Sequence, residues 1–188
     1  MTAFVESLAN SQDRDGLIAG CRARLDALPR SLPDHLLPLV TQVREQIDGL
    51  FDEAYPITLT HGDLSELNLL VDEHSGALTG VVDWAEASFL PFGFALYALE
   101  HALGAMYLTG WAYHENAHTL RRHFWDNIRA SAQPSAAERE RMKVARLAGI
   151  LFRYGTPANT EFPGMLGLGG QNNSSLAFLQ AFASSEME

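Results

Sequence analysis

The sequence has one cysteine, Cys21, among its 188 residues, and few basic side chains. A lone cysteine excludes an internal disulfide and is typical of a chain kept in a reducing compartment, so we expect a cytoplasmic location. Lysine and arginine together number 13 against 23 aspartates and glutamates, which gives a formal net charge of -10. Nucleic acids and anionic membranes are bound by basic surfaces, so this shortage of positive charge argues against both as partners.

Long apolar runs are also missing. The most apolar stretch, residues 87–99, contains Pro91 and is shorter than the roughly 20 residues that cross a bilayer. Near the N-terminus no basic segment is followed by an apolar one, so the sequence predicts no signal peptide. The length and the apolar fraction of 47% are typical of one globular domain with a sizeable core.

Apolar residues recur mostly at the spacing of amphipathic helices. Together with capping and turn residues, this spacing predicts helices at 2–8, 13–28, 34–51, 94–108, 114–130, 135–152 and 176–182. Short strands are predicted at 57–60, 69–71 and 81–82. We therefore expect a mainly α fold with a small β insert (α+β). It forms a single domain over 1–188, with N-terminal helices in 1–56, polar loops in 57–93, and helices and a tail in 94–188.

The predicted strands enclose the most informative stretch of the chain. Residues 61–68 read His-Gly-Asp-Leu-Ser-Glu-Leu-Asn, and a later apolar run ends at Asp83 and Trp84. The spacing H-x-D-L-x-x-x-N, followed by a strand ending in Asp, is the catalytic-loop and metal-loop pattern of protein kinases, with Gly62 in place of arginine. Aspartate and asparagine often serve only as turn formers. The five-residue spacing, the flanking strands and the second Asp together favour a functional site.

Phosphoryl transfer explains these residue types. The acceptor hydroxyl must be held in line with a γ-phosphate, and divalent metal ions must offset the charge on the phosphate oxygens. We expect Asp63 to orient the hydroxyl and take its proton. We expect His61, the second catalytic residue, to act mainly by holding the loop with hydrogen bonds. The side-chain oxygens of Asn68 and Asp83 are hard ligands suited to Mg²⁺. We expect the oxygen-bearing side chains of Asp63, Asn68 and Asp83 to converge on one small cavity.

Three side chains after the metal-binding Asp are candidates for substrate binding: Trp84, Glu86 and Phe89. The two aromatic rings follow Asp83 closely and could line a pocket for an apolar substrate. Packing in the core is the ordinary role of such rings, and it stays open here as the alternative.

These motifs resemble those of a known family. Residues 61–68, 79–87 and 91–93 look like the corresponding motifs of the aminoglycoside phosphotransferase and choline kinase group, in particular its fungal members without assigned substrates. The group consists of small-molecule kinases with a protein-kinase-like fold. The resemblance implies Asp63 as catalytic base, Asn68 and Asp83 as metal ligands, Mg²⁺ and ATP as cofactors, and a small organic substrate with a hydroxyl. It covers most of the chain, but only as the C-terminal lobe of such a kinase.

Two features of such kinases are not found upstream of His61. A glycine-rich loop and a strand lysine normally cover the phosphates. Here the upstream glycines are widely separated, and the only lysine is Lys143. We therefore expect a kinase-like C-terminal lobe without the N-terminal β lobe. It is either a fragment of a longer protein or a chain completed by a homo-oligomer or a partner.

Three functions stay open. The first is phosphoryl transfer from ATP to a small-molecule hydroxyl. The second is nucleotide-independent acid/base chemistry such as cyclisation, dehydration or isomerisation, which requires no cofactor and depends on a carboxylate whose pKa is raised by burial. The third is a non-catalytic binding module. The complete set of acid and amide side chains in the two loops favours an enzyme.

Two other motifs suggest different chemistry. Residues 114–118 match the H-E-x-x-H pattern of zinc hydrolases, in which two histidines one helical turn apart bind the same Zn²⁺. The pattern is short, and apolar residues on the same predicted helix indicate an ordinary packing role. Residues 166–170 resemble a phosphate loop but lack a preceding strand and a following lysine, which favours a plain loop.

Overall fold

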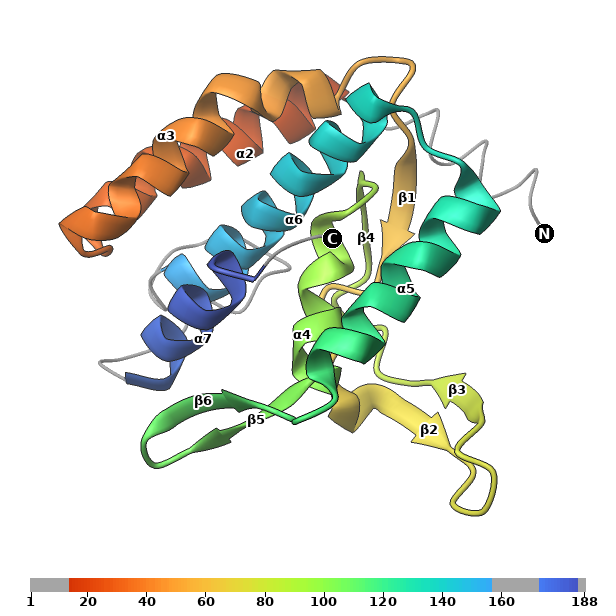
Figure 1. The fold of residues 1–188 in the computed structure, drawn as a ribbon. Helices are drawn as coiled ribbons and strands as arrows, with labels where there is room; N and C mark the ends of the chain where they lie inside the picture. The colour runs from red at the N-terminus through yellow and green to blue at the C-terminus, as the bar shows by residue number, and fades with distance from the viewer. Residues whose placement is uncertain (1–13, 157–172, 186–188) are drawn as a thin grey trace.

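The computed structural model describes residues 14–156 and 173–185 (Figure 1). The helix predicted at 2–8 and the glycine-rich stretch 166–170 lie outside these ranges. The described residues form helices and three small antiparallel sheets, which confirms the predicted mainly α fold with a small β insert. None of the helices in these ranges is both long enough and apolar enough to cross a membrane.

The N-terminal part is helical, as predicted. Its α-helices are α2 (Arg14–Ala27) and α3 (Leu37–Gln46), and its 3-10 turns are η1 (Leu28–Arg30), η2 (Asp34–Leu36) and η3 (Ile47–Leu50). The central part holds β1 (Ile57–Thr60), η4 (Glu66–Asn68), β2 (Leu69–Val71), β3 (Leu78–Val81) and β4 (Ser88–Pro91). The C-terminal part holds η5 (Phe94–Tyr97), α4 (Ala98–Ala102), β5 (Gly104–Tyr107), β6 (Gly110–Tyr113), α5 (Ala117–Ala132), α6 (Ala136–Gly155) and α7 (Asn173–Ala183).

Helix α6 is the centre of the core. It begins at the predicted capping box, in which Ser135 Oγ accepts a hydrogen bond from Glu138 N at 3.2 Å and Glu138 Oε2 accepts one from Ser135 N at 2.7 Å. Every residue from Val144 to Phe152 is buried, as expected for a helix with neighbours on all sides. Those neighbours are α3, α7, η3 and η5. Helix α6 therefore links the N-terminal helices to the C-terminal part (Figure 1).

The three sheets consist of two antiparallel strands each. Strand β1 pairs with β4, so that Thr60 lies opposite Ser88. Strand β2 pairs with β3, with Leu69 opposite Val81, and β5 pairs with β6. The β1–β4 pair joins the two ends of segment 61–87. The beginning of the catalytic loop is thereby held beside the end of the metal loop.

The helix predicted over 94–108 is wrong in its second half. Helix α4 ends at Ala102, and strand β5 begins at Gly104. A Cβ atom on Gly104 would lie 2.6 Å from the Ala112 carbonyl oxygen and 2.7 Å from the ring of Trp111, so only glycine allows the two strands of the hairpin to meet. A continuous apolar run does not by itself distinguish a buried helix from a buried strand. For the same reason the sequence does not predict β4.

Candidate active site

The catalytic loop begins with His61, which is buried. The ring atom Nε2 lies 2.7 Å from the Val82 carbonyl oxygen, and Nδ1 accepts a hydrogen bond from the backbone N–H of Asp63 at 3.3 Å. Because a carbonyl can only accept, we assign the ring proton to Nε2. Nε2 thus joins the catalytic loop to Val82, the residue before Asp83, and Nδ1 holds the turn of the catalytic loop at Asp63. This is the hydrogen bonding of a residue that positions a loop.

Gly62 occupies the position that an arginine holds in the catalytic-loop pattern of protein kinases. The surroundings of this position explain why the residue is a glycine. Its φ of +85° is unfavourable for residues with a side chain. A Cβ atom there would lie 2.9 Å from the carbonyl carbon and from the Cβ of Glu86, so the metal loop passes directly against the catalytic loop. The Gly62 carbonyl accepts hydrogen bonds from the Tyr97 hydroxyl at 3.0 Å and from Arg153 Nη1 at 3.2 Å. Burial raises the pKa of Tyr97, which keeps this donor protonated.

Replacement of Gly62 by alanine is expected to destabilise the fold by roughly 1–3 kcal/mol, because it combines an unfavourable φ with a collision between the loops. Denaturant unfolding followed by circular dichroism measures the loss. Gly20→Ala is the matched control, since a Cβ atom there has no neighbour within 4 Å and the site is helical. A Gly62→Ala variant as stable as the wild type would contradict the close contact of the two loops.

Asp63 forms an ion pair with Arg153, a residue of α6 that lies 90 positions further along the chain. The side chains of Arg153 and Asp63 are 11% and 27% exposed, so the pair is shielded while the carboxylate still reaches solvent. The guanidinium carbon lies 5.2 Å from the centre of the Tyr97 ring. Arg153 thus orients Asp63. Sequence reasoning missed this residue because a contact across so long a separation leaves no local motif.

Asn68 and Asp83 are connected through the backbone. The Asn68 carbonyl accepts a hydrogen bond from Val82 N at 3.0 Å, and the Asn68 side-chain nitrogen donates to the Asp63 carbonyl at 2.8 Å. The amide oxygen of Asn68 is therefore left available. Asp83 is exposed, and within the described residues no hydrogen bond or ion pair to its carboxylate is found. An amide oxygen and a free carboxylate are the hard donors that Mg²⁺ prefers, so this pair fits that ion.

The backbone of Asp83 is in an uncommon conformation. Its φ is +60°, a region that residues with a side chain rarely adopt. Among the described residues, the other non-glycine with positive φ is Gln133, which simply ends helix α5. Asp83 ends no helix. Such backbone strain concentrates at functional sites, where it fixes the direction of a side chain.

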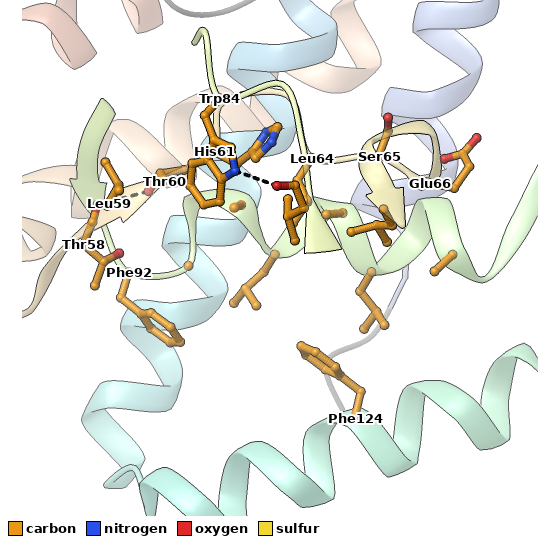
Figure 2. Close-up of a pocket in the computed structure, with 18 residues that line it drawn as sticks. Thr58, Leu59, Thr60, His61, Leu64, Ser65, Glu66, Trp84, Phe92 and Phe124 are labelled. Carbon is orange, nitrogen blue, oxygen red and sulfur yellow. Dashed lines mark hydrogen bonds between the residues drawn. The ribbon is translucent and has the colours of Figure 1, made fainter. Parts of the chain in front are cut away.

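A cavity of about 440 Å³ lies beside the catalytic loop (Figure 2). His61 and Trp84 line it, with ring centroids 4.7 Å apart. The side chains of Asp63, Asn68 and Asp83 are not among its lining residues. The expected convergence of these three side chains on one cavity is therefore not found at this cavity. The cavity and the acidic side chains are separate features of the same two loops.

The three candidates for substrate binding lie in different surroundings. Trp84 lines the cavity, is 46% exposed and donates a hydrogen bond from Nε1 to the Val81 carbonyl at 2.9 Å. Glu86 packs against Gly62, and its buried Oε2 has no hydrogen-bond partner among the described residues. Phe89 packs against the core and lines a different cavity beside α2. The structure brings only Trp84 to the cavity beside the loop.

The H-E-x-x-H segment does not have the geometry of a zinc site. Helix α5 begins at Ala117, so His114 precedes it and does not share a helical face with His118. Among residues 14–156 and 173–185, no group of three or more His, Cys, Asp and Glu side chains could hold a metal ion. A Mg²⁺ site made by Asn68 and Asp83 needs only one such side chain, because water and phosphate oxygens complete the coordination.

Comparison with known proteins supports the resemblance seen in the motifs. A family model described as the phosphotransferase enzyme family matches residues 3–125, a range that contains both the catalytic loop and the metal loop. No curated protein matches the chain. The family match covers well over half of the sequence and agrees with the aminoglycoside phosphotransferase and choline kinase motifs at 61–68 and 79–87. The chain therefore belongs to the phosphotransferase enzyme family, whose fold is kinase-like.

Proposed function

We propose that the chain transfers a phosphoryl group from ATP to a hydroxyl of a small organic molecule. The observation that carries this proposal is the hydrogen-bonded connection between the two loops. His61 and Asn68, both in the catalytic loop, bond to the backbone of Val82, directly before Asp83. Membership of the family supplies the reaction class. In this proposal residues 1–188 act as a single domain that corresponds to the C-terminal lobe of such a kinase.

Asp63 is the proposed catalytic base. Its carboxylate is partly exposed, so a substrate hydroxyl can reach it, and Arg153 holds it in one orientation through Oδ1. A carboxylate oxygen within hydrogen-bond distance of the hydroxyl can orient it and accept its proton. Arg153 touches no reacting atom in this scheme and is a positioning residue.

Asn68 and Asp83 are the proposed ligands for Mg²⁺. The bound ion would offset the negative charge on the phosphate oxygens of ATP. The surrounding charge suits a cation, because no lysine or arginine occurs between Arg44 and Arg121 while acidic residues recur throughout that segment. The positive φ of Asp83 is consistent with a carboxylate whose direction is set by the loop.

Isothermal titration calorimetry with Mg²⁺ and ATP tests the proposal. We expect saturable binding to the wild type and a loss of at least about tenfold in affinity for Asp83→Asn, since one charged ligand is removed. Glu73→Gln is the matched control, because Glu73 is an exposed carboxylate on the neighbouring turn. No heat at millimolar nucleotide would contradict ATP as the phosphoryl donor. It would favour nucleotide-independent acid/base chemistry at Asp63.

A further inference from the structure

We infer that the cavity beside the catalytic loop binds an apolar, ring-bearing small molecule that carries no negative charge. Its volume of about 440 Å³ falls in the range of small-molecule sites, roughly 300–1,000 Å³. The acidic and amide side chains assigned to phosphoryl transfer do not line it. The inference therefore goes beyond the proposed function and can be tested separately from it.

Small side chains create the space. The η5–α4 segment and the glycine before it present four small residues to the cavity, Gly93, Ala95, Ala98 and Ala102, beside the larger Leu96 and Leu99. The opposite face of the same segment carries the large buried rings of Phe94 and Tyr97. An apolar segment would normally bury both faces against protein. Here the cavity separates the face with the small residues from Phe124 of helix α5, and among the described residues no side chain fills the space between them, so an apolar ligand can supply the missing contact.

Aromatic side chains face each other across this space. Trp84 and His61 lie on one side and Phe124, from helix α5, on the other (Figure 2). Both nitrogens of His61 are already bonded within the protein, so the imidazole offers a ligand only its ring. Aromatic walls favour a ligand with rings of its own, through offset-stacked or edge-to-face contacts.

The charge on the lining of the cavity disfavours anionic ligands. Among the described residues that line the cavity, Glu66 is the only charged one, and its side chain is 58% exposed. His101 is a basic group beside this carboxylate, with its Nδ1 3.5 Å from Glu66 Oε2. Burial lowers the pKa of His101, so this ring is neutral at neutral pH and does not cancel the carboxylate. A negatively charged ligand would be repelled, whereas a neutral one would not.

Two probes with the same ring skeleton test the inference. N-phenyl-1-naphthylamine is neutral, and 8-anilino-1-naphthalenesulfonate adds one negative charge. In fluorescence titrations we expect saturable binding of the neutral probe at one site per chain, and binding of the sulfonate at least about tenfold weaker. Glu66→Gln is expected to narrow this difference. Equal or tighter binding of the sulfonate to the wild type would overturn the inference.

Variants that fill the cavity locate the site. Ala98→Phe is expected to weaken binding of the neutral probe at least tenfold. Ala95→Leu adds less volume and is expected to weaken binding by a smaller factor; it provides the test if Ala98→Phe disturbs the fold. Ala130→Phe, on the exposed face of α5, is the control. Circular dichroism verifies folding of each variant. Unchanged probe binding in both folded cavity variants would overturn the inference. Probe binding retained in Asp63→Asn separates this site from the proposed catalytic base.

Discussion

Replacement of Asp63 by asparagine is expected to lower the rate of phosphoryl transfer by about 10²–10⁴-fold, the usual contribution of a positioned acid or base. Asparagine keeps the size of the side chain but cannot accept the proton of the attacking hydroxyl. Affinity for Mg²⁺ and ATP is expected to stay near the wild-type value, because Asp63 is not a proposed metal ligand. A loss of rate without a loss of binding would identify Asp63 as the base.

The measurement is ADP release in the presence of Mg²⁺, ATP and a panel of small molecules with hydroxyl groups. Glu73→Gln again serves as the control for the loss of one carboxylate from this part of the surface. A wild type that releases no ADP with any member of the panel would count against the proposed function. An Asp63→Asn variant with full turnover would contradict the role of Asp63 while leaving the nucleotide site intact.

Replacement of Glu100 by alanine is expected to reduce the free energy of unfolding by about 3–5 kcal/mol. Glu100 is 1% exposed, and its Oε1 lies 3.0 Å from Arg146 Nη2 and its Oε2 2.7 Å from Arg121 Nη2. Arg146 is also buried, at 4% exposure, so loss of the carboxylate would leave a guanidinium inside the core that has no other ion-pair partner among residues 14–156 and 173–185. A large loss is expected because an uncompensated buried charge is costly.

Urea unfolding of Glu100→Ala and of a control variant measures this effect. Asp126→Ala is the control, since Asp126 forms an ion pair with Arg129 in which both side chains are about half exposed. Exposed pairs of this kind contribute only about 0–1 kcal/mol. Equal losses for the two variants would show that the buried cluster around Glu100 contributes no more than a surface pair.

Acid stability provides a second readout of the same cluster. Burial alone would raise the pKa of Glu100, but the hydrogen bond from Arg121 and the charge of Arg146 hold it below the usual value of 4.5. The stabilisation from this carboxylate is therefore fully present above pH 4.5 and is lost as the pH falls through the lower pKa of the folded state. Glu100→Gln, which removes the titration, is expected to show a weaker decline of stability over that acidic range.

Local chemistry explains which parts of the fold could be predicted. The capping box at Ser135 and the periodic apolar residues of the helices act within a few positions, and the structure confirms them. The strands at 57–60 and 69–71 were also predictable, because turn-forming residues border them. The β5–β6 hairpin was not predictable in this way. It depends on the contact of Gly104 with Trp111, which composition does not reveal.

The site shows the same division between local and distant contacts. The sequence predicted which residues of the two loops are candidates for the site. The structure shows that His61 and Asn68 connect the two loops through hydrogen bonds to the backbone of Val82. It could not indicate Arg153, whose partner Asp63 lies far away along the chain. Nor could it indicate the cavity, because the space arises only when the alanines of α4 face Phe124 of α5.

The most direct test of the phosphotransferase site is the place at which the nucleotide metal binds. Mn²⁺ accepts the same oxygen ligands as Mg²⁺, and its unpaired electrons broaden NMR signals of nearby nuclei. In amide spectra of this 20.7 kDa chain with Mn²⁺ and ATP, we predict broadening centred on Asn68 and Asp83 and lost in Asp83→Asn. Broadening centred elsewhere, or none at saturating nucleotide, would contradict the assignment of these loops to phosphoryl transfer.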